Sequence, residues 1–212
     1  MEKKKVLRKF THTKRFTFSV TGLFFVTLCT KKKECHFGKI FEDEMILNKA
    51  GIIADKYWRE IPSHFTSIKM YDFVIMPNHI HGIIQINEDI DYSKVIETEF
   101  ESDERYRLIM SNNDLIHTVI NSYKAIVTKE IHKLYPEMKF SWQTSMFEMI
   151  IKDESELNNI KTYIKTNPAL WKKDFENREH KKKLTDKEEA QKRFEYYAAL
   201  SANVKNILPS KN

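Results

Sequence analysis

Apolar residues along the chain recur with the periods of short strands and amphipathic helices. Residues 21–30 form a continuous β-branched and aromatic run, which predicts a buried strand. Residues 68–76 and 79–86 predict two further strands, and the Pro-Asn turn between them predicts a hairpin. A fourth strand is predicted over residues 140–151.

Three segments have apolar residues at helical spacing. The first covers residues 42–61 and is closed by Pro62, and the second begins at 112–114 and ends at Pro136. The third begins at 154 and ends near 167 and 168. The resulting order, β-α-β-β-α-β-α, predicts an α+β fold with a four-stranded, mainly antiparallel sheet and its helices on one face.

Two charged segments lie outside these predicted strands and helices. Residues 88–104 carry eight acidic side chains against Lys94 alone, which predicts a solvated loop. The chain beyond Trp171 is dense in charges of both signs and predicts an exposed C-terminal extension. We therefore expect a basic arm over residues 1–16, one domain over 17–172 and a charged extension over 173–212.

The excess of basic residues is concentrated in the N-terminal arm. The chain has 36 basic and 30 acidic side chains, and residues 1–15 hold seven of the basic ones against Glu2. A basic arm on a neutral body is typical of nucleic-acid binding, because contacts with phosphates release counterions. A solubilising tail would have the same charge, so both interpretations stay open.

Segments for secretion, membrane insertion and disulfide bonding are not predicted. The longest strongly apolar run, 21–30, has about half the length that a membrane span needs. Cys29 and Cys35 provide no disulfide framework. We expect a reduced, cytoplasmic protein that does not contact a membrane.

The His79-Ile80-His81 motif is the sharpest candidate for chemistry. Alternate residues of a strand point to the same face, so the two imidazoles should lie about 7 Å apart on one side of the sheet. Two imidazoles can ligate one divalent cation if a third ligand completes the site. A pair of ordinary histidines would give the same motif, and the motif alone does not separate the two.

The last predicted helix offers possible partners for these histidines. Tyr163 and Asn167 lie one turn apart on one side of it. If that side packs on the histidines, Asn167 can be the third ligand and Tyr163 a nucleophile. Otherwise Tyr163 is an interfacial aromatic with its hydroxyl in water.

Five segments in order resemble the REP-associated tyrosine transposases, single-tyrosine members of the HUH endonuclease superfamily. They are residues 24–31 (FFVTLCTK), 76–84 (MPNHIHGII), 122–125 (SYKA), 142–143 (WQ) and 163–168 (YIKTNP). The resemblance covers residues 17–172. Family members often have a histidine after the Trp-Gln pair, where this chain has residues 147–150 (FEMI).

The resemblance implies an HUH fold and a nuclease site. The metal-binding histidines correspond to His79 and His81, the catalytic tyrosine to Tyr163 and the third ligand to Asn167, with Mg²⁺ or Mn²⁺ as the ion. The implied activity is cleavage and transfer of single-stranded DNA that folds into hairpins, through a 5′-phosphotyrosine. We expect a nucleoid-associated monomer or homodimer.

Exposed basic and aromatic residues are candidates for DNA contacts. These candidates are Lys31, Lys32, Lys33, Lys124, Lys129, Trp142 and Lys165, and for Trp142 core filling competes with base stacking. A hairpin-binding regulator without cleavage is the alternative function. A histidine-triad phosphohydrolase fits poorly, because Ile83 stands where its third alternating histidine would be, and a second His-x-Thr or His-x-Ser segment of a two-motif phosphoesterase is missing.

Overall fold

A four-stranded antiparallel sheet forms the centre of the protein. The computed structural model describes residues 22–86, 101–177 and 185–204. The strands are β1 (Leu23–Cys29), β4 (Ile68–Ile75), β5 (His79–Ile86) and β6 (Phe147–Ile151), in the order β4-β5-β1-β6. The predicted α+β class and four-stranded antiparallel sheet are confirmed.

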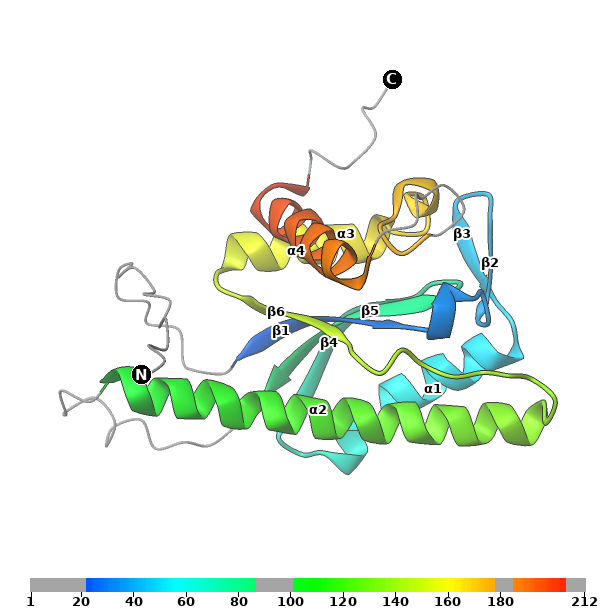
Figure 1. Ribbon diagram of the computed structural model, residues 1–212, viewed down its shortest axis with the longest axis horizontal. Helices are drawn as coiled ribbons and strands as arrows, with labels where there is room; N and C mark the ends of the chain where they lie inside the picture. The colour runs from blue at the N-terminus through cyan, green and yellow to red at the C-terminus, as the bar shows by residue number, and fades with distance from the viewer. Residues whose placement is uncertain (1–21, 87–100, 178–184, 205–212) are drawn as a thin grey trace, which may run out of the picture.

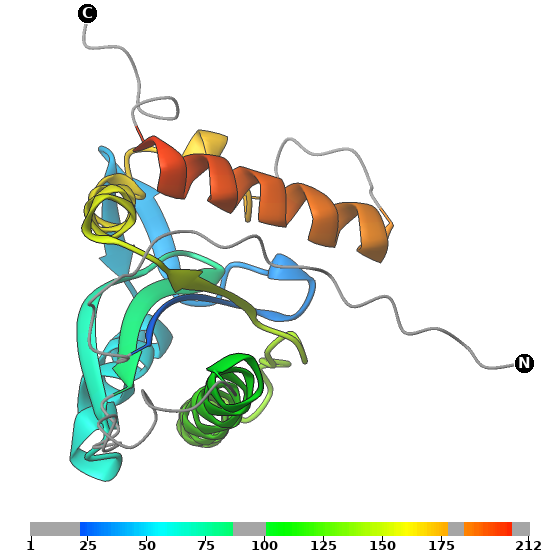
Figure 2. The same ribbon diagram turned by 90° about the vertical axis from the view of Figure 1, so that its left-hand side faces the viewer.

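Helices cover both faces of this sheet, whereas the sequence predicted one face. Helices α1 (Lys49–His64) and α2 (Glu101–Leu134) lie on one side, and α3 (Glu154–Thr166) and α4 (Asp186–Ala202) on the other (Figures 1 and 2). The central strands β1 and β5 are buried on both faces, which explains their continuous apolar sequences. Each face has its own hydrophobic core.

Alternation along β5 divides its residues between the two cores. Ile80, Ile84 and Ile86 belong to the core under α1 and α2, and Ile83 belongs to the core under α3 and α4. Gly82 is required on the first side, because a Cβ atom there would lie 2.3 Å from Cζ2 of Trp58. The indole therefore packs against β5 directly after His81.

A short hairpin replaces the start of the predicted first helix. Strands β2 (Gly38–Phe41) and β3 (Glu44–Leu47) are joined by Glu42 and Asp43, whose φ angles are 48° and 61°. Two left-handed residues suit a two-residue hairpin turn, but Glu-Asp lacks the glycine that normally signals one. Helix α1 starts later than predicted, where the Asn48 side chain accepts a hydrogen bond from the Gly51 N–H.

Helix α2 and strand β6 also differ from their predicted limits. Helix α2 begins at Glu101, inside the predicted acidic loop, and residues 88–100 of that loop lie outside the described residues. Strand β6 begins at Phe147 and not at residue 140. The preceding segment is a loop whose Phe140 and Trp142 pack into the first core, and Trp142 pairs with Thr30 only as an isolated bridge.

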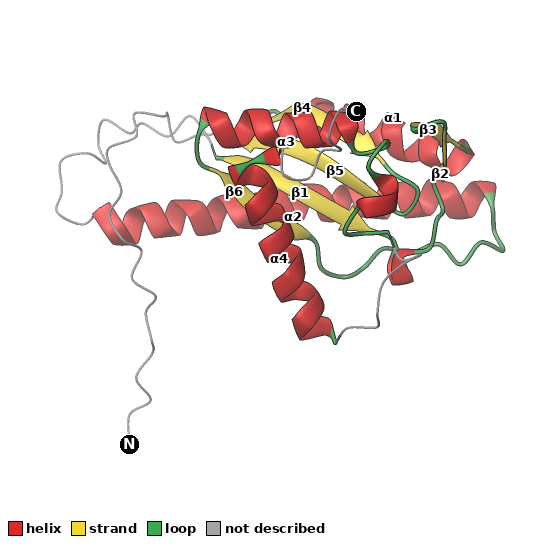
Figure 3. Ribbon diagram, turned by 90° about the horizontal axis from the view of Figure 1, so that it is seen from above, coloured by secondary structure: helices red, strands yellow, loops and turns green. Residues whose placement is uncertain are grey.

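The chain beyond residue 172 is part of the same body and was predicted as an exposed extension. The turn η3 (Trp171–Lys173) is followed by a buried segment, and α4 contributes Tyr197 and Leu200 to the second core. Thr185 and Glu188 form a capping box at the start of α4. Figure 3 shows α3 and α4 over the same side of the sheet. The basic arm, residues 1–16, lies outside the described residues.

Within the described ranges, the helices are too short or too polar to cross a membrane.

Candidate metal and nucleophile site

His79 and His81 converge on the α3 and α4 side of the sheet. Their strand pairs with β1, where Cys29 is opposite His79 and Thr27 is opposite His81. Both imidazoles are fully buried, and their Nε2 atoms lie 3.0 Å apart. Two ring nitrogens at this distance must share a proton or a cation, because two lone pairs repel each other.

Neighbouring side chains hold the outer nitrogen of each imidazole. Nδ1 of His79 lies 2.8 Å from Asn78 Oδ1, and Nδ1 of His81 lies 2.9 Å from Thr27 Oγ1. The amide oxygen only accepts, so Nδ1 of His79 carries the hydrogen and its Nε2 lone pair faces inward. Burial and the neighbouring His81 lower the pKa of His79 to about 3, so its neutral form dominates at neutral pH.

Asp174 completes a three-residue group that could hold a metal ion. Its carboxylate oxygens lie 4.0 Å from His79 Nε2 and 3.9 Å from His81 Nε2. The three ligand atoms lie within 4.8 Å of one another, and all three residues are buried. Burial alone would raise the pKa of Asp174, but the two histidines and the Tyr163 hydroxyl hold it well below its usual range. Asp174 is therefore the anionic ligand of the group.

Tyr163 points at this group from α3. Ile160, Tyr163 and Ile164 form the buried stripe of the helix, and Asp153 caps its N-terminus. The Tyr163 hydroxyl donates to Asp174 Oδ2 at 2.6 Å and lies 3.3 Å from His81 Nε2. Burial, with the charge of Asp174, raises the pKa of Tyr163 well above its ordinary value. The phenol is thus protonated unless a cation at the site offsets the charge.

Asn167 joins the same group one helical turn later. Its side chain is fully buried, and Nδ2 donates to Asp174 Oδ2 at 2.6 Å. Its Oδ1 is buried without a hydrogen-bond partner in the described parts of the chain. A buried oxygen lone pair without a partner is costly, and a hard cation such as Mg²⁺ or Mn²⁺ would satisfy it. The donor set of two imidazoles, a carboxylate and an amide therefore fits such an ion.

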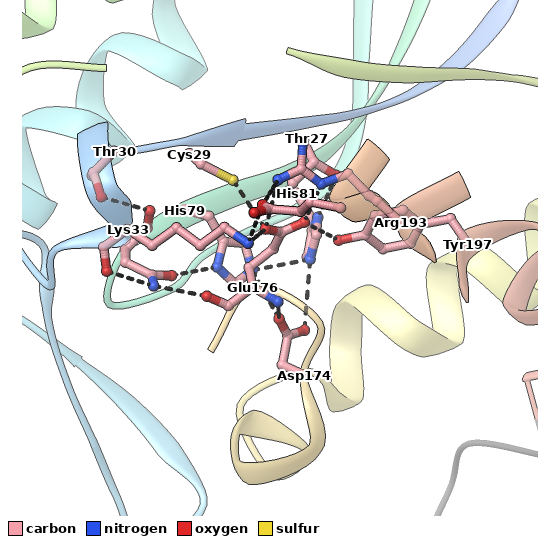
Figure 4. A network of polar contacts seen from close by, with 12 residues as sticks. Thr27, Cys29, Thr30, Lys33, His79, His81, Asp174, Glu176, Arg193 and Tyr197 are labelled. Atoms are coloured by element: carbon pink, nitrogen blue, oxygen red, sulfur yellow. Dashed lines mark hydrogen bonds and ion pairs between the residues drawn. The ribbon is translucent and has the colours of Figure 1, made fainter. Parts of the chain in front are cut away.

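Glu176 holds the segment that carries Asp174. Its backbone N–H donates to Asp174 Oδ1 at 2.6 Å, and its carbonyl accepts from Asn78 Nδ2 at 3.0 Å. Its carboxylate is paired with Lys33 at 2.8 Å and Arg193 at 2.9 Å (Figure 4). Burial alone would raise the pKa of Glu176, but Lys33 and Arg193 lower it to about 2. This network ties Lys33 after β1, Asn78 before β5 and Arg193 of α4 to the candidate metal site.

The sequence did not reveal Asp174, Glu176 or Arg193, because their region was predicted as an exposed extension. Asp174, Phe175 and Glu176 are all buried, although two of the three are acids in a charged segment. Acidic residues in such a segment are usually solvated, so the sequence carries no local signal for these two.

The site is closed in this conformation. The side chains of His79, His81, Tyr163 and Asn167 are completely buried. The Trp171 ring stacks beside His79 at 6.1 Å between centroids, and the Tyr197 ring lies 5.6 Å from His81. A nucleic acid can therefore reach Tyr163 only if the cover formed by residues 171–177 and α4 moves away.

The predicted DNA contacts fall into two groups. Lys31, Lys32, Lys129 and Lys165 are exposed. Lys33 and Lys124 are buried, which corrects their prediction as surface contacts. The Lys33 ammonium is paired with Glu176 and Glu189, and the Lys124 ammonium donates to the Gln143 carbonyl at 3.0 Å.

Trp142 is half-buried and fills space in the first core. Its indole ring packs against Phe37 and Phe140, and Nε1 donates to the Lys124 carbonyl at 3.2 Å. These contacts support core filling, the competing interpretation, over base stacking.

Comparisons with known proteins give one relative at substantial identity. An "Uncharacterized protein" of Haemophilus influenzae is 34% identical over 167 residues, which cover 79% of this chain and 91% of the relative. A solved structure of a REP-associated tyrosine transposase bound to a REP hairpin is similar with a TM-score of 0.40 and 15% identity, over 76% of this chain and 73% of that one. A likeness at this level carries no argument about activity. No protein-family model matches the chain.

Proposed function

The chain belongs to the same family as the uncharacterized Haemophilus influenzae protein, and we propose that it is a metal-dependent endonuclease and strand transferase for single-stranded DNA. Its substrate would be a strand that folds into a hairpin, cleaved through a 5′-phosphotyrosine at Tyr163. The proposed substrate class rests on the motif resemblance. The proposed roles of the residues rest on the side-chain geometry of the candidate site.

One observation carries the proposal. The Tyr163 hydroxyl lies within hydrogen-bond distance of both Asp174 and His81, two members of the candidate metal group. A tyrosine in a packed core needs only one hydrogen-bond partner for its hydroxyl. A phenol oxygen beside two imidazoles, a carboxylate and an amide oxygen would instead become an activated nucleophile when these groups hold a cation that offsets the charge of Asp174.

We infer a two-step reaction from these residues. The Tyr163 oxygen attacks phosphorus, the bond from phosphorus to the 3′ oxygen breaks, and that oxygen leaves as a 3′-hydroxyl after taking a proton from water. Asp174 Oδ2 accepts the phenolic hydrogen bond at 2.6 Å and so orients the Tyr163 oxygen. The phenolic proton would pass to water once a bound cation offsets the charge of Asp174. The phosphotyrosine conserves the energy of the ester, so a second 3′-hydroxyl can displace Tyr163 and join strands.

His79, His81, Asp174 and Asn167 would hold the ion. A bound Mg²⁺ or Mn²⁺ would polarise a non-bridging oxygen of the scissile phosphate and stabilise the phenolate. Asn78 and Thr27 would keep both Nε2 atoms directed at it, as outer hydrogen bonds do in metal sites.

A binding-only function is the second candidate, and the closed site favours it. Tyr163 and the histidines are fully buried in this conformation, so a regulator that binds hairpins with its exposed lysines would not need to uncover them. The two functions differ in whether the DNA backbone is ever broken.

A nicking assay separates them. The protein is incubated with end-labelled oligonucleotides that form hairpins with single-stranded flanks, with Mn²⁺ or with EDTA. Cleavage is expected at one phosphodiester, with Mn²⁺ only, and on hairpins but not on a fully paired duplex. Hairpin binding without cleavage in either condition would favour the regulator.

A further inference from the structure

A basic hollow lies on the surface where β1 ends. It has a volume of about 630 Å³, and its lining includes Lys31, Lys32, His132 and Lys139, with Glu34 as its acidic member and Met138 on an apolar part. The side chains of Lys31, Lys32 and Lys139 are exposed. The hollow therefore combines a net positive charge with apolar surface, which suits a ligand that carries both phosphates and flat apolar groups.

The turn that carries Lys31 and Lys32 is strained. The turn η1 (Lys31–Lys33) has φ angles of 55° at Lys32 and 54° at Lys33, in the left-handed region that is unfavourable for residues with a Cβ atom. Backbone strain of this kind persists only where surrounding contacts enforce it. Here the buried Lys33 ammonium contacts Glu176 and Glu189, both at 2.8 Å.

Because of this turn, the side chain of Lys33 points away from those of Lys31 and Lys32. Lys33 is directed into the network that holds Asp174, while Lys31 and Lys32 remain on the surface and line the hollow. A straight continuation of β1 would alternate the side chains and could not produce this arrangement.

Backbone hydrogen bonds attach the hollow to the candidate metal site. The Lys31 N–H donates to the Ser141 carbonyl at 2.8 Å, which joins the turn to the loop that follows Lys139. The Thr30 N–H donates to the Asn78 carbonyl at 2.9 Å, and Asn78 holds His79. Lys31, which lines the hollow, thus directly follows the residue that is hydrogen-bonded to Asn78.

We propose that this hollow binds the single-stranded segment that flanks the cleaved phosphate. This inference rests on the proposed function and adds a binding site to it. Lys31, Lys32 and Lys139 would contact successive phosphates, and Met138 would contact a sugar or a base. A duplex stem presents its phosphates on a convex surface, so its backbone cannot enter a concave hollow of this size as an unpaired strand can.

The test compares two charge-matched variants. K31Q/K32Q/K139Q removes the three lysines of the hollow, and K56Q/K69Q/K152Q removes three exposed lysines elsewhere. Each is made in the Tyr163→Phe background, so that cleavage does not disturb binding. Fluorescence anisotropy then measures affinity for a bare hairpin and for the same hairpin with a single-stranded extension, at several salt concentrations.

The hollow variant should bind the extended hairpin about tenfold or more weakly, with a slope of log affinity against log salt reduced by about 2, since each contact with a single strand contributes about 0.7. Its affinity for the bare hairpin should stay within about twofold, and the control triple variant should match the parent on both. An equal loss on both DNAs, or no loss on the extended one, would overturn the inference.

The two proposals fail in different ways. If the parent binds both hairpins and wild type cleaves, but the hollow variant is unaffected, the hollow is not the binding site and the proposed function stands. If the parent binds neither DNA at any salt concentration, the proposed function itself is wrong and this inference falls with it.

Discussion

The Tyr163 hydroxyl donates a 2.6 Å hydrogen bond to Asp174 Oδ2, which connects helix α3 to a segment eleven residues further along the chain. Asp174 also lies within 4 Å of both histidines, at 4.0 and 3.9 Å. One carboxylate therefore serves the candidate nucleophile and the candidate metal ligands together. Most of the site's testable behaviour follows from this carboxylate and the residues that hold it.

Asp174→Asn should weaken metal binding with little change in shape. An amide keeps the size of the side chain but removes the negative charge that offsets a divalent cation. We expect the Mn²⁺ dissociation constant to rise by at least the 10- to 100-fold typical of losing even an outer-shell group, as measured by isothermal titration calorimetry. Asp72→Asn, on the exposed side of β4, is the control and should bind like wild type. Equal affinities for all three proteins would show that Asp174 is not a ligand.

Unfolding free energy should fall as the pH drops from about 6.5 towards 4 in the absence of metal. The folded state lowers the pKa of His79 to about 3, so between these pH values the unfolded chain binds a proton at His79 that the folded chain does not. The loss is at most about 1.4 kcal/mol per pH unit from this residue. Urea unfolding in EDTA at pH 7, 5.5 and 4.5 measures it.

Two histidine variants assign that pH dependence. His79→Asn should flatten the slope, because the replacement does not titrate. His64→Asn, at the exposed end of α1, is the matched control. If both variants keep the wild-type slope, the pKa of His79 is not lowered in the folded protein.

The Glu176 network should be sensitive to the loss of one partner. Glu176→Gln leaves the buried Lys33 and the mostly buried Arg193 with Glu189 as their remaining carboxylate, so we expect a loss of at most about 3–5 kcal/mol in the free energy of unfolding. The double variant K33M/E176M should lose less than E176Q, because it removes a charge of each sign. Chemical denaturation of the three proteins tests this, and a double variant less stable than E176Q would contradict it.

Gly82→Ala should shift β5 next to His81. The new Cβ would lie 2.3 Å from the Trp58 ring, so we expect destabilisation of about 1–3 kcal/mol from overpacking. Replacing Trp58 with Phe in the same chain makes room and should recover part of the stability, as followed by thermal unfolding. If Gly82→Ala alone is neutral, the indole does not press on β5 as described.

Local patterns predicted the elements of the sheet well, because strands β1, β4 and β5 have strong apolar sequences and a Pro-Asn turn. The same patterns could not place the helices, since β1 is apolar on both faces and its sequence does not say how the two faces are covered. His79, His81, Tyr163 and Asn167 were identified from a strand period, a helix period and a family resemblance. Asp174 and Glu176 were not predicted, because their burial depends on α4 packing over the sheet. This is a long-range contact with no local signal in the sequence.

The limits of the predicted domain, residues 17–172, stay a prediction. The site described here nevertheless needs residues 174–177 and 193–197, which lie beyond that limit. A truncation at residue 172 would remove Asp174 and expose the Tyr163 side of the sheet, so studies of activity should use the full chain.

The central claim is that Tyr163 forms a covalent bond with DNA, and one measurement tests it directly. Wild type and Tyr163→Phe are each incubated with a hairpin that carries single-stranded flanks in the presence of Mn²⁺, and the products are digested and analysed by mass spectrometry. Tyr57→Phe, on α1 at the opposite face, serves as the matched control. Wild type and the control should yield a nucleotide adduct on the peptide that contains Tyr163, and Tyr163→Phe should bind the DNA but yield none. Cleavage by Tyr163→Phe, or an adduct on a different residue, would contradict the proposed mechanism.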